Sequence, residues 1–309
     1  MQSKIRLITV VSLIMAIFFV SCKKTETGTV TTDSTTELAA QIDDHSNVST
    51  INDAVENDVN FVLESNSSFN GRIENALGIV CNANAVADSA NGKKRITITY
   101  NGTNCAGNRS LTGVVVVSMP LGTNWKDAGA VLSVSTQNLK ITRLKDSKSI
   151  IINGTKTITN VTGGRLMDLA SRGTITHVTV GTDTLTFDNG KQRIWQIAKQ
   201  RMFTYSGGIV ITTTGTHTEG VVSGIAEWGT NRFGNAFITA ISQPLVVRQD
   251  CNFRLVSGEV IHAKLIADVT VTFGLDAAGV ATSCPLTGYY FKATWKGVNG
   301  VTKTTILPY

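Results

Sequence analysis

The 309-residue sequence lacks the short motifs that mark many catalytic and metal-binding sites. It contains no H-E-x-x-H motif, no G-x-S-x-G nucleophile elbow and no P-loop, and its cysteines form no C-x-x-C pair. Ser206 precedes two glycines but lacks the flanking glycine of a nucleophile elbow, so a turn explains it. We therefore expect a protein without a catalytic centre, a metal or a cofactor.

The basic residues lack the clustering that nucleic-acid binding requires. The formal charge is +6, from 28 Lys and Arg against 22 Asp and Glu, but no basic helix or aromatic-studded basic face is present. We expect no nucleic-acid partner. With 42% hydrophobic and 16% charged residues the chain can bury a substantial core. Its length allows one large domain or two small ones, and we expect one.

The N-terminus has the pattern of a lipoprotein signal peptide over residues 1–21. Lys4 and Arg6 precede an uncharged stretch, residues 7–20, that is shorter than the ~20 apolar residues of a membrane-spanning helix. The stretch ends in Phe-Val-Ser-Cys at residues 19–22, with phenylalanine in place of the usual leucine. We expect lipidation of Cys22. An unlipidated secretory signal and a retained anchor are the alternatives.

This signal predicts a lipid-anchored protein of the cell envelope, and we expect the outer membrane. The residues after Cys22 are basic rather than acidic, so they do not decide between the periplasmic face and surface display.

Export suggests that the other four cysteines form disulfides. Cys81, Cys105, Cys251 and Cys284 allow three connectivities. Sequence neighbours that flank strand segments suit adjacent antiparallel strands. We therefore expect the pairs Cys81–Cys105 and Cys251–Cys284.

The segment before the β-rich region has two parts. Residues 22–36 are polar, rich in threonine and without periodicity, which predicts a flexible tether. Residues 37–69 are predicted to be a helical segment that packs on the β domain. Their apolar residues recur at three- and four-residue steps, at Val48, Ile51, Val55, Val59 and Val62. We expect a break at residues 45–47 that divides a short helix from a longer one.

Residues 70–309 are predicted to be an antiparallel β domain. Apolar and polar residues alternate over 96–100, 268–273 and 289–295, as in strands with one buried face. Turns are predicted at Asn189-Gly190 and Asn299-Gly300. The fold class is therefore all-β, either an antiparallel sandwich or an open curved sheet, and the sequence does not choose between them.

The order of these landmarks resembles a family of hypothetical lipoproteins of the Bacteroidota type. The likeness covers roughly residues 78–296, and it includes Ile-Thr-Ile-Thr-Tyr-Asn-Gly-Thr-Asn-Cys at 96–105 and Gly-Thr-Asn-Arg-Phe-Gly at 229–234. Residues 274–279, before Cys284, are longer than the tight turn of that family. The resemblance implies an architecture and cysteine positions, and it carries over no activity or catalytic residue.

Two glutamates and three histidines are the residues that most resemble catalytic groups or ligands. Glu219 and Glu227 would lie about 26 Å apart in one continuous strand, against the ~5–9.5 Å of glycosidase carboxylate pairs. Only a hairpin would bring them together, and we interpret both as solvated charges. His177 and His217 have no carboxylate or cysteine at ligand spacing, and His262 is expected to be exposed.

Four tryptophans raise the question of a sugar-binding surface. Trp125 and Trp228 stand beside Gly-Thr-Asn loops, so they are candidate ligand contacts. Large aromatic side chains beside loops more often cap the core. Trp195 and Trp295 follow strand alternation and are predicted to be core residues.

These patterns favour a non-enzymatic envelope lipoprotein that presents a disulfide-stapled β domain for binding or structural work. A carrier or sensor of an apolar ligand or a glycan is the alternative, and it requires inward positions of a curved sheet to be left unfilled. A secreted hydrolase comes third, and it requires acidic or histidine residues to converge in a cleft. The expected partners are the membrane, through the N-terminal lipid, and a glycan or a protein.

The lipid anchor is tested by Cys22→Ala. Without the acylated sulfur the protein should move from the detergent phase to the aqueous phase, or accumulate as an unprocessed precursor, because the acyl chains supply the membrane affinity. Detergent phase partition and the mass of the N-terminal peptide measure both outcomes. A processed Cys22→Ala protein that still enters the detergent phase contradicts the prediction.

Overall fold

The structure is a computed structural model that describes residues 30–70, 80, 82–263, 267–284, 288–296 and 300–309. A long helix is followed by a succession of strands, so the predicted all-β class with an N-terminal helical segment is confirmed. The chain divides into two compact units, residues 1–36 and residues 37–309. Among the described residues, no helix combines the length and the apolar character needed to cross a membrane.

The helices are short except for the first. They are α2 (Val30–Ser65), α3 (Ser67–Asn70) and α4 (Leu169–Arg172), with 3-10 turns η1 (Leu166–Asp168) and η2 (Gln249–Cys251). The strands are β1 (Ala83–Ala90), β2 (Lys93–Thr103), β3 (Arg109–Pro120), β4 (Ala130–Arg143), β5 (Ser149–Asn160), β6 (Thr174–Phe187), β7 (Gln192–Tyr205), β8 (Ile209–Gly215), β9 (His217–Glu219), β10 (Val222–Thr230), β11 (Ala236–Arg248), β12 (Arg254–Ala263), β13 (Val269–Leu275), β14 (Tyr290–Lys296) and β15 (Thr302–Pro308).

The strands form one antiparallel sheet. Within the described residues it has fifteen strands in the order β1 to β7 and then β10 to β15, with β8 inserted between β7 and β11, and β9 paired with β10. Neighbours in the sheet are mostly neighbours in sequence, as tight hairpins require. The predicted turn at Asn189-Gly190 joins β6 to β7, and Gly190 has a φ of 75°, which glycine adopts without strain. Asn299 of the other predicted turn lies outside the described residues.

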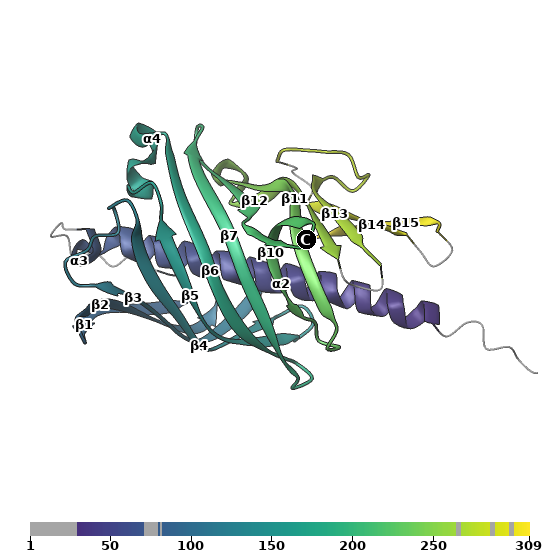
Figure 1. The fold of residues 1–309 in the computed structure, drawn as a ribbon, viewed down its shortest axis with the longest axis horizontal. Coiled ribbons are helices and arrows are strands. Elements are labelled where there is room, and N and C mark those ends of the chain that lie inside the picture. The colour runs from purple at the N-terminus through teal and green to yellow at the C-terminus, as the bar shows by residue number, and fades with distance from the viewer. Residues whose placement is uncertain (1–29, 71–79, 81, 264–266, 285–287, 297–299) are drawn as a thin grey trace, which may run out of the picture. The chain divides into compact units, whose positions relative to one another are not determined.

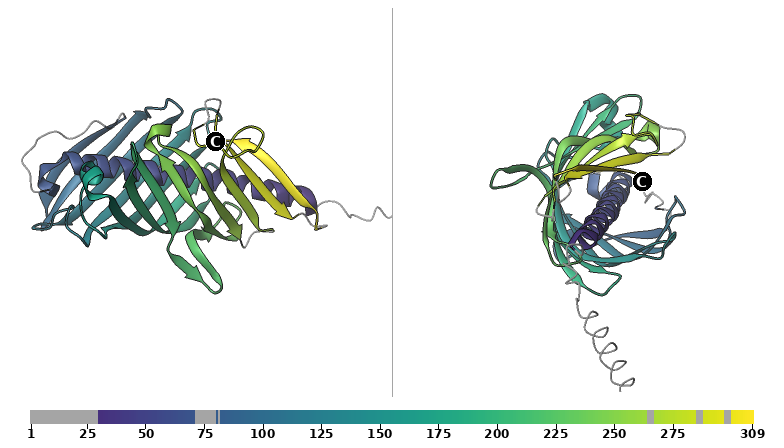
Figure 2. Two further views of the ribbon diagram at one scale, coloured as in Figure 1. Left: turned by 90° about the horizontal axis from the view of Figure 1, so that it is seen from above. Right: turned by 90° about the vertical axis from the view of Figure 1, so that its right-hand side faces the viewer.

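The sheet is the open curved form, and not a sandwich of two sheets. Its path runs from β1 at one edge to β15 at the other. In Figure 1 and in the end-on view of Figure 2 the strands follow an arc, and α2 from Glu37 onward lies along the concave side. We call this concave side the trough.

The apolar face of α2 fills the trough as the sequence predicts. Val48, Val59 and Val62 have no exposed surface, and they share one core cluster with Ile98 and Val115 of the sheet. Through these contacts the helix packs against the sheet. Inward and outward side chains alternate along the strands, as the period of two predicts.

Two predictions about α2 are wrong. The helix is continuous through residues 45–47, and His45 is held there by Glu227 on the sheet. The helix also begins at Val30 and therefore includes the last seven residues of the predicted 22–36 tether. No glycine or proline interrupts residues 30–65, and helix formation propagates easily from a turn that is already formed.

One predicted disulfide is present. Cys251, in η2, is bonded to Cys284, which follows β13, and their Cα atoms are 5.4 Å apart. Cys105 is also disulfide-bonded. Cys81 lies outside the described residues, so the pair Cys81–Cys105 stays a prediction. Cys22 lies outside them too.

Candidate functional site: the charged trough and the convex face

Negative charge gathers on α2 and positive charge on the sheet. From Glu37 to Ser65 the helix carries seven Asp or Glu and no Lys or Arg, whereas residues 70–309 carry 24 Lys or Arg against 13 Asp or Glu. Four cations of the inner sheet face are buried beside the helix, namely Lys94, Lys156, Lys199 and Arg201. An acidic helix therefore lies in a basic trough.

Glu227, on β10, is fully enclosed in the trough. Lys199 Nζ lies 2.5 Å from its Oε1, and Trp195 Nε1 donates to its Oε2 at 2.8 Å. His45 Nε2, from α2, lies 3.3 Å from the same Oε2. One carboxylate thus ties β7 and β10 to the helix. We call these four residues the Glu227 cluster.

The surroundings of Glu227 keep it ionised. Burial alone raises the pKa of a carboxyl, but Lys199 and His45 outweigh burial and lower the pKa of Glu227 to about 2. Burial lowers the pKa of His45, and also that of His262, whose ring centroid is 4.7 Å from that of His45. Since the folded pKa of Glu227 is below its ordinary value, its contribution to stability is present above about pH 4.5 and is lost as pH falls toward 2.

Two further ion pairs continue this network along the trough. Lys156 Nζ lies 3.0 Å from Asp183 Oδ2, and Asn52 of α2 accepts a hydrogen bond from the same Nζ at 2.5 Å. Gly154 leaves the space that the Asp183 carboxylate occupies, because a Cβ at residue 154 would overlap it. Arg201 donates to Glu56 of α2 at 2.8 Å.

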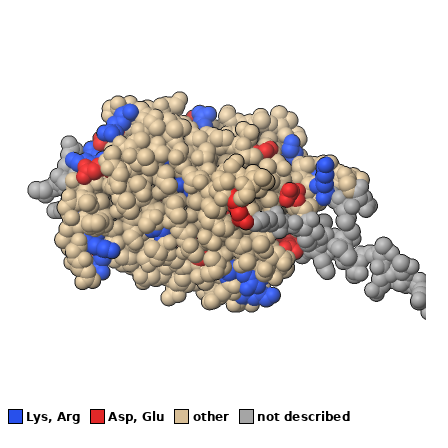
Figure 3. Space-filling view, in the orientation of Figure 1, with Lys and Arg blue, Asp and Glu red and all other residues tan. Residues whose placement is uncertain are grey.

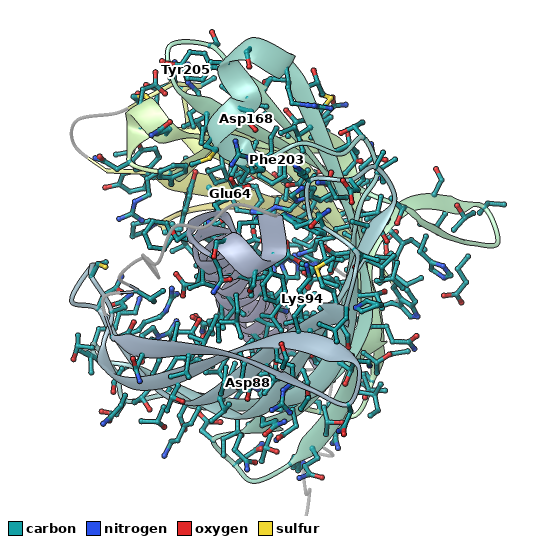
Figure 4. The ribbon with its side chains drawn as sticks, turned by 90° about the vertical axis from the view of Figure 1, so that its left-hand side faces the viewer. Glu64, Asp88, Lys94, Asp168, Phe203 and Tyr205 are labelled. Carbon is teal, nitrogen blue, oxygen red and sulfur yellow. A yellow bond between two sulfur atoms is a disulfide. The ribbon has the colours of Figure 1, made fainter. Side chains whose placement is uncertain are left out.

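The last turns of α2 carry two carboxyls whose pKa is raised. Burial raises the pKa of Asp58 to about 6, although a hydrogen bond from Tyr100 acts to lower it. Burial likewise raises the pKa of Glu64 to about 7, although a hydrogen bond from the Leu166 N–H acts to lower it. Their stabilising contribution is full below their ordinary pKa and is lost as pH rises through 6 and 7. In Figure 4, Glu64 and Lys94 lie on the inner side of the sheet.

The first turns of α2 are held by arginines and amides. Arg143 donates to Asp43 at 2.7 Å and Arg232 to Asp44 at 2.6 Å. Asn231 donates to Glu37 at 2.8 Å. The helix is therefore bonded to the sheet along its whole length from residue 37.

The Glu227 cluster combines residue types that acid–base catalysis uses, but its burial gives it a structural role. Glu227 is 0% exposed and His45 is 7% exposed, so both are buried away from any substrate. A carboxylate that neutralises a buried lysine keeps the interior free of unpaired charge.

Glu219 and Glu227 do not share a cleft. Glu219 is exposed on β9, as predicted, whereas the prediction of a solvated Glu227 is wrong. Strand β10 points this side chain into the trough, where Lys199 neutralises it.

The three histidines also lie apart in the fold. His177 is buried on the inner face, with its ring centroid 4.9 Å from that of Trp125. His262 is buried and contacts Thr239, so its predicted exposure is wrong. His217 lies on β9 outside the trough. Among the described residues, one group brings together side chains of the kinds that bind metals, namely Asp250, Cys251 and Cys284. The sulfurs of Cys251 and Cys284 are bonded to each other in a disulfide.

Only one of the two candidate tryptophans reaches the surface. Trp125 is 0% exposed and caps the core, so its expected contact with a ligand is wrong. Trp228 is half-buried and follows the inward-facing Glu227, so it faces outward. The ring of His217 stacks on it, with centroids 4.1 Å apart and planes 12° apart.

A hairpin formed by β9 and the start of β10 projects from the sheet next to this stack (Figure 2). Its tip residue Val221 is fully exposed. Glu219 is exposed on the same hairpin.

The convex face over β5 to β8 carries no charged side chain among its described outward positions. Threonines dominate these positions, with a few aliphatic residues such as Val180, Ile194 and Met202 exposed between them. Figure 3 shows this broad face, with Lys, Arg, Asp and Glu mostly toward its margins. The fold thus buries ion pairs inside and presents an uncharged face outside.

The buried network was not predicted, although the sequence contains a signal for it. Lys199 and Arg201 are in phase with the buried Ile197 and Phe203 of β7, so the period of two places both cations inside. The seven acids of residues 37–65, without one Lys or Arg, are the complementary signal.

The Glu227 cluster predicts different effects for two conservative substitutions. Glu227→Gln leaves Lys199 buried without a counter-ion and should lower the free energy of unfolding by about 3–5 kcal/mol. Glu219→Gln, at an exposed position, should change it by less than about 0.5 kcal/mol. Urea unfolding followed by circular dichroism measures both. Equal stability of the two variants would contradict the structural role of Glu227.

No protein-family model, no curated protein and no solved structure matches this chain. The resemblance to Bacteroidota lipoproteins therefore stays a prediction.

Proposed function

We propose that the protein is a non-enzymatic envelope lipoprotein, anchored through Cys22, that presents the outer surface of its β domain to a partner. The observation that carries this proposal is the filled trough. A curved sheet could otherwise receive a ligand on its concave side, but here α2 occupies that side along its described length from residue 37.

The filling of the trough counts against a carrier of an apolar ligand. Such a carrier needs inward positions that side chains leave empty. The inward positions instead pack against Val48, Val59 and Val62 of α2 or form ion pairs such as Lys156–Asp183. Apart from a recess beside the first half of α2, the surface left for recognition is the convex face and the projecting hairpin.

The second candidate function is the binding of a neutral glycan by the same outer surface. The half-buried Trp228 ring is the specific observation that favours it. His217 stacks on one face of the ring and the ring also packs against the cluster of Ile225, Ile238 and Ala240, so a sugar would contact its remaining exposed part. Flat aromatic rings bind the apolar faces of sugar rings, and the adjoining convex face would desolvate no charge on contact.

The experiment is a binding titration of the full-length protein with fluorescent neutral oligosaccharides of glucose, xylose and N-acetylglucosamine. Trp228→Ala should weaken binding at least tenfold, because it removes the stacking surface. Thr99→Ala, at an exposed position on β2 and therefore several strands away from Trp228, is the control and should leave binding unchanged.

The same mixtures are checked for products. Turnover that is lost in His217→Ala, with an unchanged melting temperature, contradicts the non-enzymatic role. If Trp228→Ala binds as tightly as the wild type, the glycan site does not lie at Trp228. If no oligosaccharide binds, the glycan candidate is wrong.

A further inference from the structure

An open recess lies between the first half of α2 and the ends of β3, β4 and β5. Its volume is about 310 Å³ including the open mouth. Four cations, Arg109, Arg143, Lys148 and Arg232, line it together with two carboxylates, Asp43 and Asp44. Asp146 and Asp188 also pair with Arg143 and Arg232, so the four cations are matched by four carboxylates.

Three of these cations have carboxylate partners. Arg143 binds Asp43, and also Asp146 at 2.6 Å. Lys148 Nζ lies 3.3 Å from Asp43 Oδ2. Arg232 binds Asp44 at 2.6 Å and Asp188 at 3.1 Å.

Arg109 is different. Its hydrogen bond goes from Nη2 to the neutral amide oxygen of Asn47, at 3.3 Å, and within the described residues no carboxylate lies within 4.0 Å of it. Burial, with Arg143 and Arg254 close by, lowers the pKa of Arg109, while Asp43 acts weakly in the opposite sense. Asp43 itself is held by Arg143 and Lys148.

A half-buried guanidinium beside two others, without an anion of its own, is electrostatically unfavourable. The guanidinium is a planar fork of five N–H donors that suits oxyanions, and here most of those donors have no protein acceptor. The recess beside it is open, so an anion can enter from solvent.

We propose that this recess binds a phosphate-type oxyanion, with Arg109 as its main ligand and with Arg143 and Lys148 beside it. The anion has two sources, free phosphate or the phosphoryl group of an envelope lipid or glycan. The site is independent of what the convex face binds.

The test is isothermal titration calorimetry of the full-length protein in detergent, in buffer free of phosphate and sulfate. Inorganic phosphate and glycerol phosphate are the two probes. We expect saturable binding of at least one, weakened at least tenfold by Arg109→Gln and less strongly by Arg109→Lys, which keeps the charge but loses the fork. Lys140→Gln removes an exposed charge from the outer side of β4, and as the control it should bind like the wild type.

Comparison of the two probes identifies the source. Equal affinity indicates the free anion, and tighter binding of glycerol phosphate indicates a phosphorylated headgroup. Both outcomes support the site. The proposal is overturned if neither probe binds at a concentration of about 20 mM. It is also overturned if Arg109→Gln and the wild type bind with equal affinity.

Melting temperatures separate loss of the site from loss of the fold. Phosphate should raise the melting temperature of the wild type and leave that of Arg109→Gln unchanged, because only a protein with the site gains from the ligand. Without phosphate, Arg109→Gln should melt no lower than the wild type, since it removes an uncompensated charge. A variant that melts well below the wild type without phosphate contradicts the proposal, because Arg109 would then be a structural residue.

Discussion

The attraction between an acidic helix and a basic trough is the interaction on which the rest of the structure depends. A strongly curved sheet cannot close its own concave side, so the inward side chains need a partner. Helix α2 supplies both kinds of contact. Its valines cover the apolar strands, and its carboxylates and amides reach Arg201, Arg232 and Lys156.

Burial of these charges constrains the sequence more than burial of apolar groups does. An apolar contact tolerates exchange of one aliphatic residue for another, whereas loss of one member of a buried ion pair leaves the other uncompensated. Lys199 and Glu227 therefore depend on each other, and both depend on the register that places β7 beside β10. The convex face over β5 to β8 has no such requirement, which fits its uncharged, threonine-rich composition.

Much of the fold follows from sequence patterns that act locally. The period of two located β2, β13 and β14, and the valine spacing located the buried face of α2. The continuity of α2 and the burial of Glu227 and His262 could not be predicted in this way. They depend on partners such as Glu227 for His45, which lie more than a hundred residues away in the sequence.

The same limit explains the exposure of the tryptophans. Trp125 and Trp228 have similar Gly-Thr-Asn neighbours, but one caps the core and the other faces outward. Local sequence specifies a loop or a strand, and the long-range arrangement decides which side of the sheet a ring occupies. Arg109 shows the same point, because only the fold reveals that it lacks a carboxylate partner.

The central claim is that α2 is part of the core and not a lid that opens to release a ligand. Native-state hydrogen exchange measures this directly, by comparing backbone amides between Val48 and Val62 with those of β5 and β6. The account predicts that the helix amides exchange only through global unfolding, with the same opening free energy as the strands. Opening of α2 at a free energy several kcal/mol lower, with β5 and β6 still protected, would contradict it.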